Sequence, residues 1–279
     1  MCDKKKKRVA FYYQTFTDQS HDLLKSLDPH CVTDLYLSSV HFGTDSDTGR
    51  PYIHLNDYSP QDFPNFLERV SQLPDSIRVH IMIGGAGGGL APLCVDQETY
   101  LPLLRGFLAC NPRITGINID VEESGINEHR LEKLIVKLNY LYPDFEFAMA
   151  PILSPCTRHD QSEFDFATFV RSNASKYIST YCVQMYGVFS ADALRTFICQ
   201  FPTIDSSQVM LGTISGEFTK PSDLKKNYEQ ILQEFPDIQG IVNWELYGTP
   251  AWWAKTVLGC YNTLEETYYD FYVNNCSIL

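Results

Sequence analysis

The chain has 279 residues, of which 44% are hydrophobic and 20% charged, and its formal net charge is −12. Such a composition is that of a soluble globular protein, and the length suits one barrel domain of about 250 residues, spanning 1–279 without a second domain. The acidic charge argues against nucleic acid and against an anionic membrane as partners. A neutral or cationic ligand fits better, as does any ligand in a locally tuned cleft.

The first eight residues contain five basic side chains and no apolar run of signal-peptide length. The sequence therefore predicts neither a secretory signal nor a transmembrane helix. The lysines at 4–7 match a nuclear address, but a solvated basic lead-in (1–8) to the first strand is the preferred interpretation. Nine scattered cysteines without a C-x-x-C pair favour reduced thiols in a cytoplasmic protein over a disulfide framework.

Eight apolar, β-rich runs alternate with helix-like segments along the chain. The runs cover 9–16, 33–42, 77–83, 114–123, 145–153, 178–186, 209–214 and 241–246, and apolar spacing predicts helices over 101–109, 129–142, 163–172, 191–201 and 221–235. This repetition predicts an α/β fold, a single-domain (β/α)8 TIM barrel, with an open doubly wound sheet as the alternative. The turn-rich segment 43–60 predicts a small hairpin above the barrel.

The fourth run carries the most unusual pattern. Aliphatic side chains occupy 117, 119 and 121, whereas Asn118, Asp120 and Glu122 occupy the alternate positions. Because side chains alternate faces along a strand, the three polar residues share one face. On an edge strand that face would lie in water. In a parallel barrel it points inward, where charge is costly unless it has a function.

Three other strand ends carry notable residues. A glycine run at 84–89 follows the third strand, Gln184 and Tyr186 share a face at the end of the sixth, and Trp244 lies on the eighth. Active sites of (β/α)8 barrels lie at the carboxyl ends of the strands. These residues are therefore expected to converge with Glu122 on one rim.

Other motifs are weaker. The glycine run fits no phosphate-binding pattern, so its glycines are expected to allow sharp turns or close approach to a ligand. The scattered histidines form no zinc motif, and we expect neither a metal nor another cofactor. Tyr12 and Tyr13 are either cleft aromatics or core residues, with the core interpretation slightly favoured.

These segments resemble glycoside hydrolase family 18, which comprises chitinases, endo-β-N-acetylglucosaminidases and lectin-like relatives. Residues 115–122, T-G-I-N-I-D-V-E, resemble the family's D-G-x-D-x-D-x-E. Residues 82–85, M-I-G-G, resemble S-x-G-G, and residues 184–187, Q-M-Y-G, resemble Q-x-Y-N. Trp244 lies on the strand that bears the family's tryptophan. The resemblance spans nearly the whole barrel.

The resemblance implies substrate-assisted, retaining hydrolysis of β-1,4-linked N-acetylglucosamine in chitin oligosaccharides or in the chitobiose core of N-glycans. It assigns catalysis to Glu122, Asp120 and Tyr186, and substrate contacts to Asn118, Gln184, Trp244, Tyr12 and Gly85. The expected partner is an N-acetylglucosamine-containing oligosaccharide bound by a monomer. The alternatives are a non-catalytic sugar-binding protein on the same scaffold and an unrelated barrel enzyme.

The chain departs from the family pattern at three positions. Thr115 replaces an aspartate, but it lies on the same outward face as residues 117, 119 and 121, so we expect that change to be structural. Gly187 replaces an asparagine, which loosens substrate contacts. Asn118 replaces the middle aspartate on the inward face, and we hypothesise that its amide donates a hydrogen bond to an ionised Asp120, holds it charged and slows the reaction.

Overall fold

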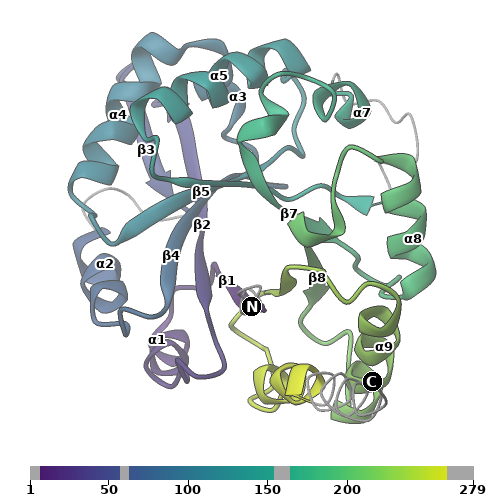
Figure 1. The fold of residues 1–279 in the computed structure, drawn as a ribbon. Helices are drawn as coiled ribbons and strands as arrows, with labels where there is room; N and C mark the ends of the chain where they lie inside the picture. Colours follow the sequence, from purple (N-terminus) through teal and green to yellow (C-terminus); the bar gives the residue numbers. More distant parts are fainter. Residues whose placement is uncertain (1–6, 57–62, 154–163, 263–279) are drawn as a thin grey trace, which may run out of the picture.

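The computed structural model describes residues 7–56, 63–153 and 164–262, and within them the strands form a closed barrel of eight parallel strands surrounded by helices (Figure 1). Sequential barrel strands pair with one another, and β1 pairs with both β9 and β2, which closes the barrel. The predicted fold class is confirmed. The barrel strands are β1 (Arg8–Tyr13), β2 (Asp34–Thr44), β4 (Arg78–Gly84), β5 (Ile114–Asp120), β6 (Glu146–Met149), β7 (Ile178–Gln184), β8 (Val209–Ile214) and β9 (Gly240–Trp244).

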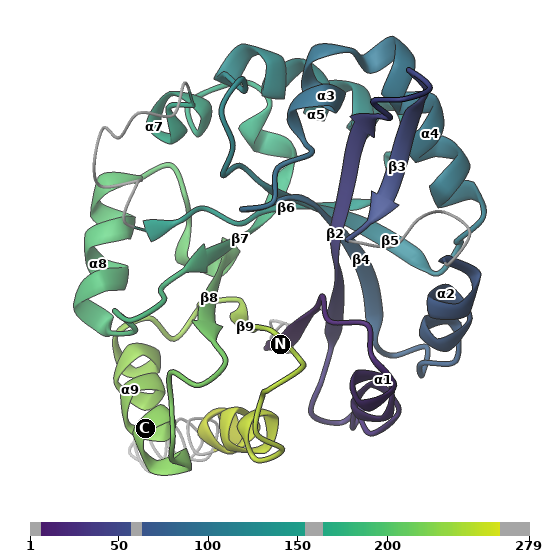
Figure 2. The same cartoon turned by 180° about the vertical axis from the view of Figure 1, so that it is seen from behind.

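The helices form an outer ring around the barrel (Figure 2). Helix α4 begins at Gln97 rather than at 101, because the Asp96 side chain caps it by accepting from Thr99 N. Residue 163, where one helix was predicted to begin, lies outside the described residues. No helix in the described ranges is long and apolar enough to cross a membrane. The helices are α1 (Asp18–Lys25), α2 (Phe63–Ser71), α3 (Ala91–Val95), α4 (Gln97–Ala109), α5 (Glu128–Leu141), α7 (Phe166–Phe169), α8 (Ala191–Gln200), α9 (Pro221–Glu234), a further segment at 253–262, and the 3₁₀ turns η1 (Ser175–Tyr177) and η2 (Ser206–Gln208).

The predicted hairpin after the second run is present. Strand β3 (Pro51–Leu55) pairs antiparallel with the distal half of β2, from Val40 opposite Leu55 to Thr44 opposite Pro51. The two strands run side by side in Figure 2 and extend the sheet beyond the barrel wall. The hairpin therefore lies at the carboxyl end of β2, beside the rim where the candidate site was predicted. Residues 57–60 of the predicted segment lie outside the described part of the chain.

The barrel interior is lined by the inward residues of alternate strand positions. These side chains form a cluster separate from the larger core between barrel and helices, as alternation in a closed parallel barrel requires. Trp244 packs on this cluster from the carboxyl end, so the cluster forms the floor beneath the rim. Its members are Ala10, Tyr12, Tyr36, Met82, Ala150, Cys182, Met210 and Val242.

The amino end of the barrel is closed by a buried ionic network. Arg8, 5% exposed, donates two hydrogen bonds to the fully buried Asp34 and also contacts Glu146. His80 lies 3.0 Å from Asp34, and Arg78 pairs with it from the surface. The prediction of a solvated lead-in through residue 8 is therefore wrong for Arg8, because its charge neutralises acids inside the barrel. Residues 1–6 of that lead-in lie outside the described residues.

Candidate active site

Strand β5 presents its polar row to the inside of the barrel. Asn118 and Asp120 are 0% and 4% exposed, and Glu122 follows directly, half-buried at the rim. Ile117 and Ile119, on the opposite face, are each 1% exposed in the outer core. Both faces of the strand are thus covered. The barrel interpretation of this segment is confirmed, and the solvent-facing edge strand is excluded.

Gln184 joins the two carboxyl groups. Its amide nitrogen Nε2 lies 3.2 Å from Asp120 Oδ1, 3.0 Å from Glu122 Oε1 and 3.0 Å from the carbonyl oxygen of Ala150. Gln184 is the last residue of β7 and half-buried, so strand register fixes the origin of its side chain. The structure therefore brings Asp120, Glu122 and Gln184 together at the carboxyl end of the barrel, as the sequence predicted.

The carboxyl pair favours a shared proton. Burial, then the charge of Glu122 and a hydrogen bond with it, raise the pKa of Asp120 well above its usual range. Two close carboxyl groups in a low-dielectric site ionise together only at high cost. Burial and the neighbouring carboxyl group therefore favour the protonated form of Asp120. Such a pair can both give up a proton and balance a positive charge.

Aromatic side chains flank this pair. Tyr186 is half-buried, and burial, followed by the charges of Asp120 and Glu122, raises the pKa of its phenol, which therefore stays protonated and able to donate. Trp244 is half-buried, with its ring centroid 5.0 Å from that of Tyr12. Tyr12 itself is only 3% exposed, in contact with Trp244 above and Tyr36 below. This burial favours the core interpretation for Tyr12, which supports the site from beneath.

The glycine run allows close approach of backbone to backbone. Gly84 and Gly85 have φ of +96° and +94°, and a Cβ on Gly84 would lie 2.1 Å from the Asp120 carbonyl oxygen. The Gly85 N–H donates to that same oxygen at 3.0 Å. A side chain at Gly84 would push β4 away from β5, and one at Gly85 would collide with the Met82 side chain, whose Cε would lie 2.7 Å from the new Cβ. These glycines therefore place the loop against the backbone of a proposed catalytic residue.

The anion held by the rest of the run is a carboxylate of the chain itself. Glu123 accepts hydrogen bonds from the backbone N–H groups of Gly89, Leu90 and Ala91, at the start of α3. Donors that would otherwise suit a phosphate are thus occupied. The sequence analysis missed this role of Glu123, whose signal was an acid directly after the inward row and facing a glycine run.

Asn118 has a different partner from the one expected. Its Nδ2 donates to Cys182 Sγ at 3.6 Å, and its Oδ1 is buried with no hydrogen-bond partner among the described residues. The hypothesis that Asn118 donates to an ionised Asp120 is therefore wrong. The amide instead faces across the barrel to β7, and burial favours the neutral form of Asp120. Thr115, by contrast, is exposed at the other end of β5, as its outward parity predicted.

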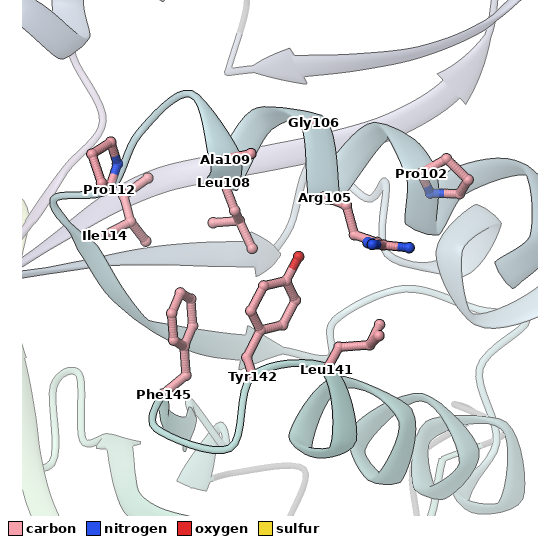
Figure 3. Close-up of a pocket in the computed structure, with 10 residues that line it drawn as sticks. All are labelled: Pro102, Arg105, Gly106, Leu108, Ala109, Pro112, Ile114, Leu141, Tyr142 and Phe145. Carbon is pink, nitrogen blue, oxygen red and sulfur yellow. The ribbon is translucent and has the colours of Figure 1, made fainter.

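A cavity of about 590 Å³ lies elsewhere, outside the barrel between α4 and α5 (Figure 3). In that view the rings of Tyr142 and Phe145 face Leu108 of α4, with Arg105 at one side. None of the residues predicted for the site lines it. Its walls lack a paired carboxyl group, so the convergence at the carboxyl rim remains the candidate site.

Comparisons with known proteins agree with this fold. A fungal endo-β-N-acetylglucosaminidase of glycosyl hydrolase family 18 superposes with a TM-score of 0.74 at 21% identity, covering 91% of this chain and 97% of that one. The chitinase ChiC from Aspergillus fumigatus gives 0.72 at 22% identity, covering 88% and 93%. A family 18 chitinase from Pseudoalteromonas aurantia gives 0.67 at 16% identity, covering 91% and 99%. No family model and no curated protein matches the sequence. The chain thus has the fold of these family 18 proteins, as its sequence motifs predicted.

Proposed function

We propose that the protein is a glycosidase that cleaves β-1,4-linked N-acetylglucosamine by substrate-assisted, retaining hydrolysis. The observation that carries the proposal is the carboxyl pair of Asp120 and Glu122, bridged by Gln184 at the carboxyl rim of the barrel. Three solved structures with the same fold are described as a family 18 endo-β-N-acetylglucosaminidase, a chitinase and a family 18 chitinase. Fold alone does not assign activity, so the side-chain geometry is the main support.

In the proposed reaction Glu122 protonates the glycosidic oxygen while the acetamido oxygen of the substrate attacks the anomeric carbon. The bond to the leaving sugar breaks, an oxazolinium ion forms, and water then opens it. Asp120 accepts from the acetamido N–H and balances the developing positive charge. Tyr186 donates its phenol O–H to the acetamido oxygen, and its raised pKa keeps that proton in place.

Two further side chains shape the substrate position in this proposal. Trp244, half-buried above the inner cluster, forms an apolar floor for the sugar ring. Gln184 bridges the two carboxyl groups before the substrate arrives and orients the acetamide afterwards. Because its hydrogen bonds are to acidic groups, they are stronger than neutral ones and preorganise the pair.

The decisive experiment is Glu122→Gln, assayed on a fluorogenic chitotrioside and on a labelled high-mannose glycan. Glutamine keeps the shape but gives up no proton at neutral pH, so turnover should fall by about 10²–10⁴-fold while sugar binding is spared. Glu98→Gln, at an exposed glutamate of α4, is the matched control and should retain the parent rate. Hydrolysis by the Glu122 variant at the parent rate would show that Glu122 is not the acid. The substrate cleaved by the parent distinguishes chitin from N-glycan activity.

A sugar-binding protein with little turnover is the second candidate. It is favoured by Asn118 and Gly187, which stand where the family pattern has an aspartate and an asparagine. A thiazoline mimic of the oxazolinium ion separates the two, because an enzyme binds its intermediate mimic far more tightly than the free sugar. Equal affinities for the thiazoline and N-acetylglucosamine in a calorimeter, with no product from either glycan, would favour the second candidate.

A further inference from the structure

Another carboxylate lies at the same rim, on the loop that follows β8. Glu217 is half-buried and accepts two backbone hydrogen bonds, one from Gly187 N to Oε1 at 3.0 Å and one from Ile214 N to Oε2 at 3.3 Å. Strands β7 and β8 are neighbours in the barrel (Figure 1). One side chain therefore ties the segment after β7 to the end of β8.

Both tied residues adjoin proposed substrate contacts. Gly187 directly follows Tyr186 in the chain, and Ile214 pairs in register with Trp244 of β9. Glu217 is close enough to Tyr186 for its charge to act on the phenol, together with the charges of Asp120 and Glu122. The carboxylate thus binds the residue next to Tyr186 in the chain without being one of the groups assigned to the reaction.

The backbone at Gly187 needs such an anchor. Its φ is +73°, and a Cβ built on it would meet nothing within 4 Å, so no side-chain packing holds this position. Glycine also has the widest backbone freedom of any residue. The Gly187 N–H bond to Glu217 holds the peptide that follows Tyr186, together with the bond from Val188 N to the Met185 carbonyl oxygen at 3.0 Å. Gly187 therefore lacks the side chain of the asparagine in the family pattern, and its backbone is held from the next loop.

We propose that Glu217 is a positioning residue that holds Tyr186 in the orientation needed to donate to the acetamido oxygen. This inference rests on the proposed function. It differs from a loop-stabilising role such as that of Glu123, which also accepts backbone N–H groups but does not adjoin Tyr186. The loop after β8 would then help to position the glycan-binding site, although β8 contributes no residue to the proposed chemistry.

A double-mutant cycle on the full chain tests the inference, with Glu217→Gln, Tyr186→Phe and the pair. Glutamine offers one acceptor oxygen for two N–H groups, so one anchor is lost while the side-chain volume is kept. We expect Glu217→Gln to lower kcat on the chitotrioside about tenfold with little change in KM, and to have almost no further effect in the Tyr186→Phe background. Glu123→Gln is the control, and its effect should add fully to that of Tyr186→Phe.

Amide hydrogen exchange at Gly187 gives a readout independent of activity. Exchange should be faster in Glu217→Gln than in the parent and unchanged in Glu123→Gln. Unchanged exchange at Gly187, or full additivity with Tyr186→Phe in an active enzyme, would overturn the inference while leaving the proposed function intact. A parent that cleaves neither glycan refutes the proposed function itself, and with it the catalytic purpose of the anchor, even where Gly187 exchange responds to the substitution.

Discussion

The ionic network at the amino end of the barrel allows a quantitative test of stability. Asp34 is fully buried and accepts from Arg8 at 2.7 and 3.0 Å and from His80 at 3.0 Å. Asp34→Asn keeps the volume but removes the charge and turns amide hydrogens toward guanidinium hydrogens. Because Arg8 is 5% exposed, its charge would remain buried with Glu146 as the remaining acid beside it. Removing one partner of a buried pair costs about 3–5 kcal/mol of unfolding free energy.

The assay is urea denaturation of the parent, Asp34→Asn and the exposed control Asp237→Asn at pH 7 and at lower pH. Burial opposes ionisation of Asp34, but the His80 hydrogen bond and the Arg8 charge hold its pKa well below the usual range. A depressed pKa contributes stability above the unfolded value of about 3.9, and this contribution is lost as the pH falls further. The gap between parent and variant should therefore be full at pH 7 and shrink below about pH 4. A gap under about 1 kcal/mol at pH 7, or one that widens in acid, would refute this account.

Three further substitutions test the candidate site. Trp244→Ala should weaken oligosaccharide binding by about 1–3 kcal/mol, measured in a calorimeter. A loss of fold without a separable effect on binding would show that Trp244 is a core residue and not a substrate contact. Asn118→Asp should raise kcat and alter the acidic limb of the pH–rate profile with KM unchanged, because a carboxyl group can exchange protons with Asp120 and an amide cannot. A variant no faster than the parent at any pH would contradict this. Gly85→Ala should destabilise the fold by about 1–3 kcal/mol in thermal denaturation, because φ is +94° and the new Cβ would lie 2.7 Å from Met82 Cε. Its control Gly106→Ala, in open space on α4, should be neutral or stabilising.

The strands were predictable because each has a local signal. The run predicted at 209–214 coincides with β8, and the polar row of β5 faces inward as its alternation required. The alternation of side chains along the sequence shows which residues share a face of the strand. In a barrel strand that is buried on both faces, a polar face is exceptional and therefore stands out. The glycines at 84 and 85 were also interpretable in advance, because close backbone approach is what glycine uniquely allows.

The partners of these side chains were not predictable. The contact between Gln184 and Glu122 spans 62 positions along the chain and depends on how far β5 and β7 rise around β6. Parity showed that Asn118 points inward but not that Cys182 would lie opposite it. Arg8 was assigned to a solvated lead-in because its charge resembles that of the preceding lysines. Only the closed barrel reveals the two acids that contact it, since Asp34 lies on β2 and Glu146 on β6.

The contact of Asn118 with Cys182 changes the effect expected from having asparagine, in place of the aspartate of the family pattern, at this position. The raised pKa of Asp120 originates from its burial and its proximity to Glu122, and neither depends on residue 118. Asn118 is neutral, fully buried and directed toward Cys182, so it adds no charge to the pair. An aspartate there would add a second group that can take up the Asp120 proton, whereas the amide cannot take one up. The substitution therefore removes a route for the proton and leaves the acid itself in place, so its effect should fall on rate rather than on the type of reaction.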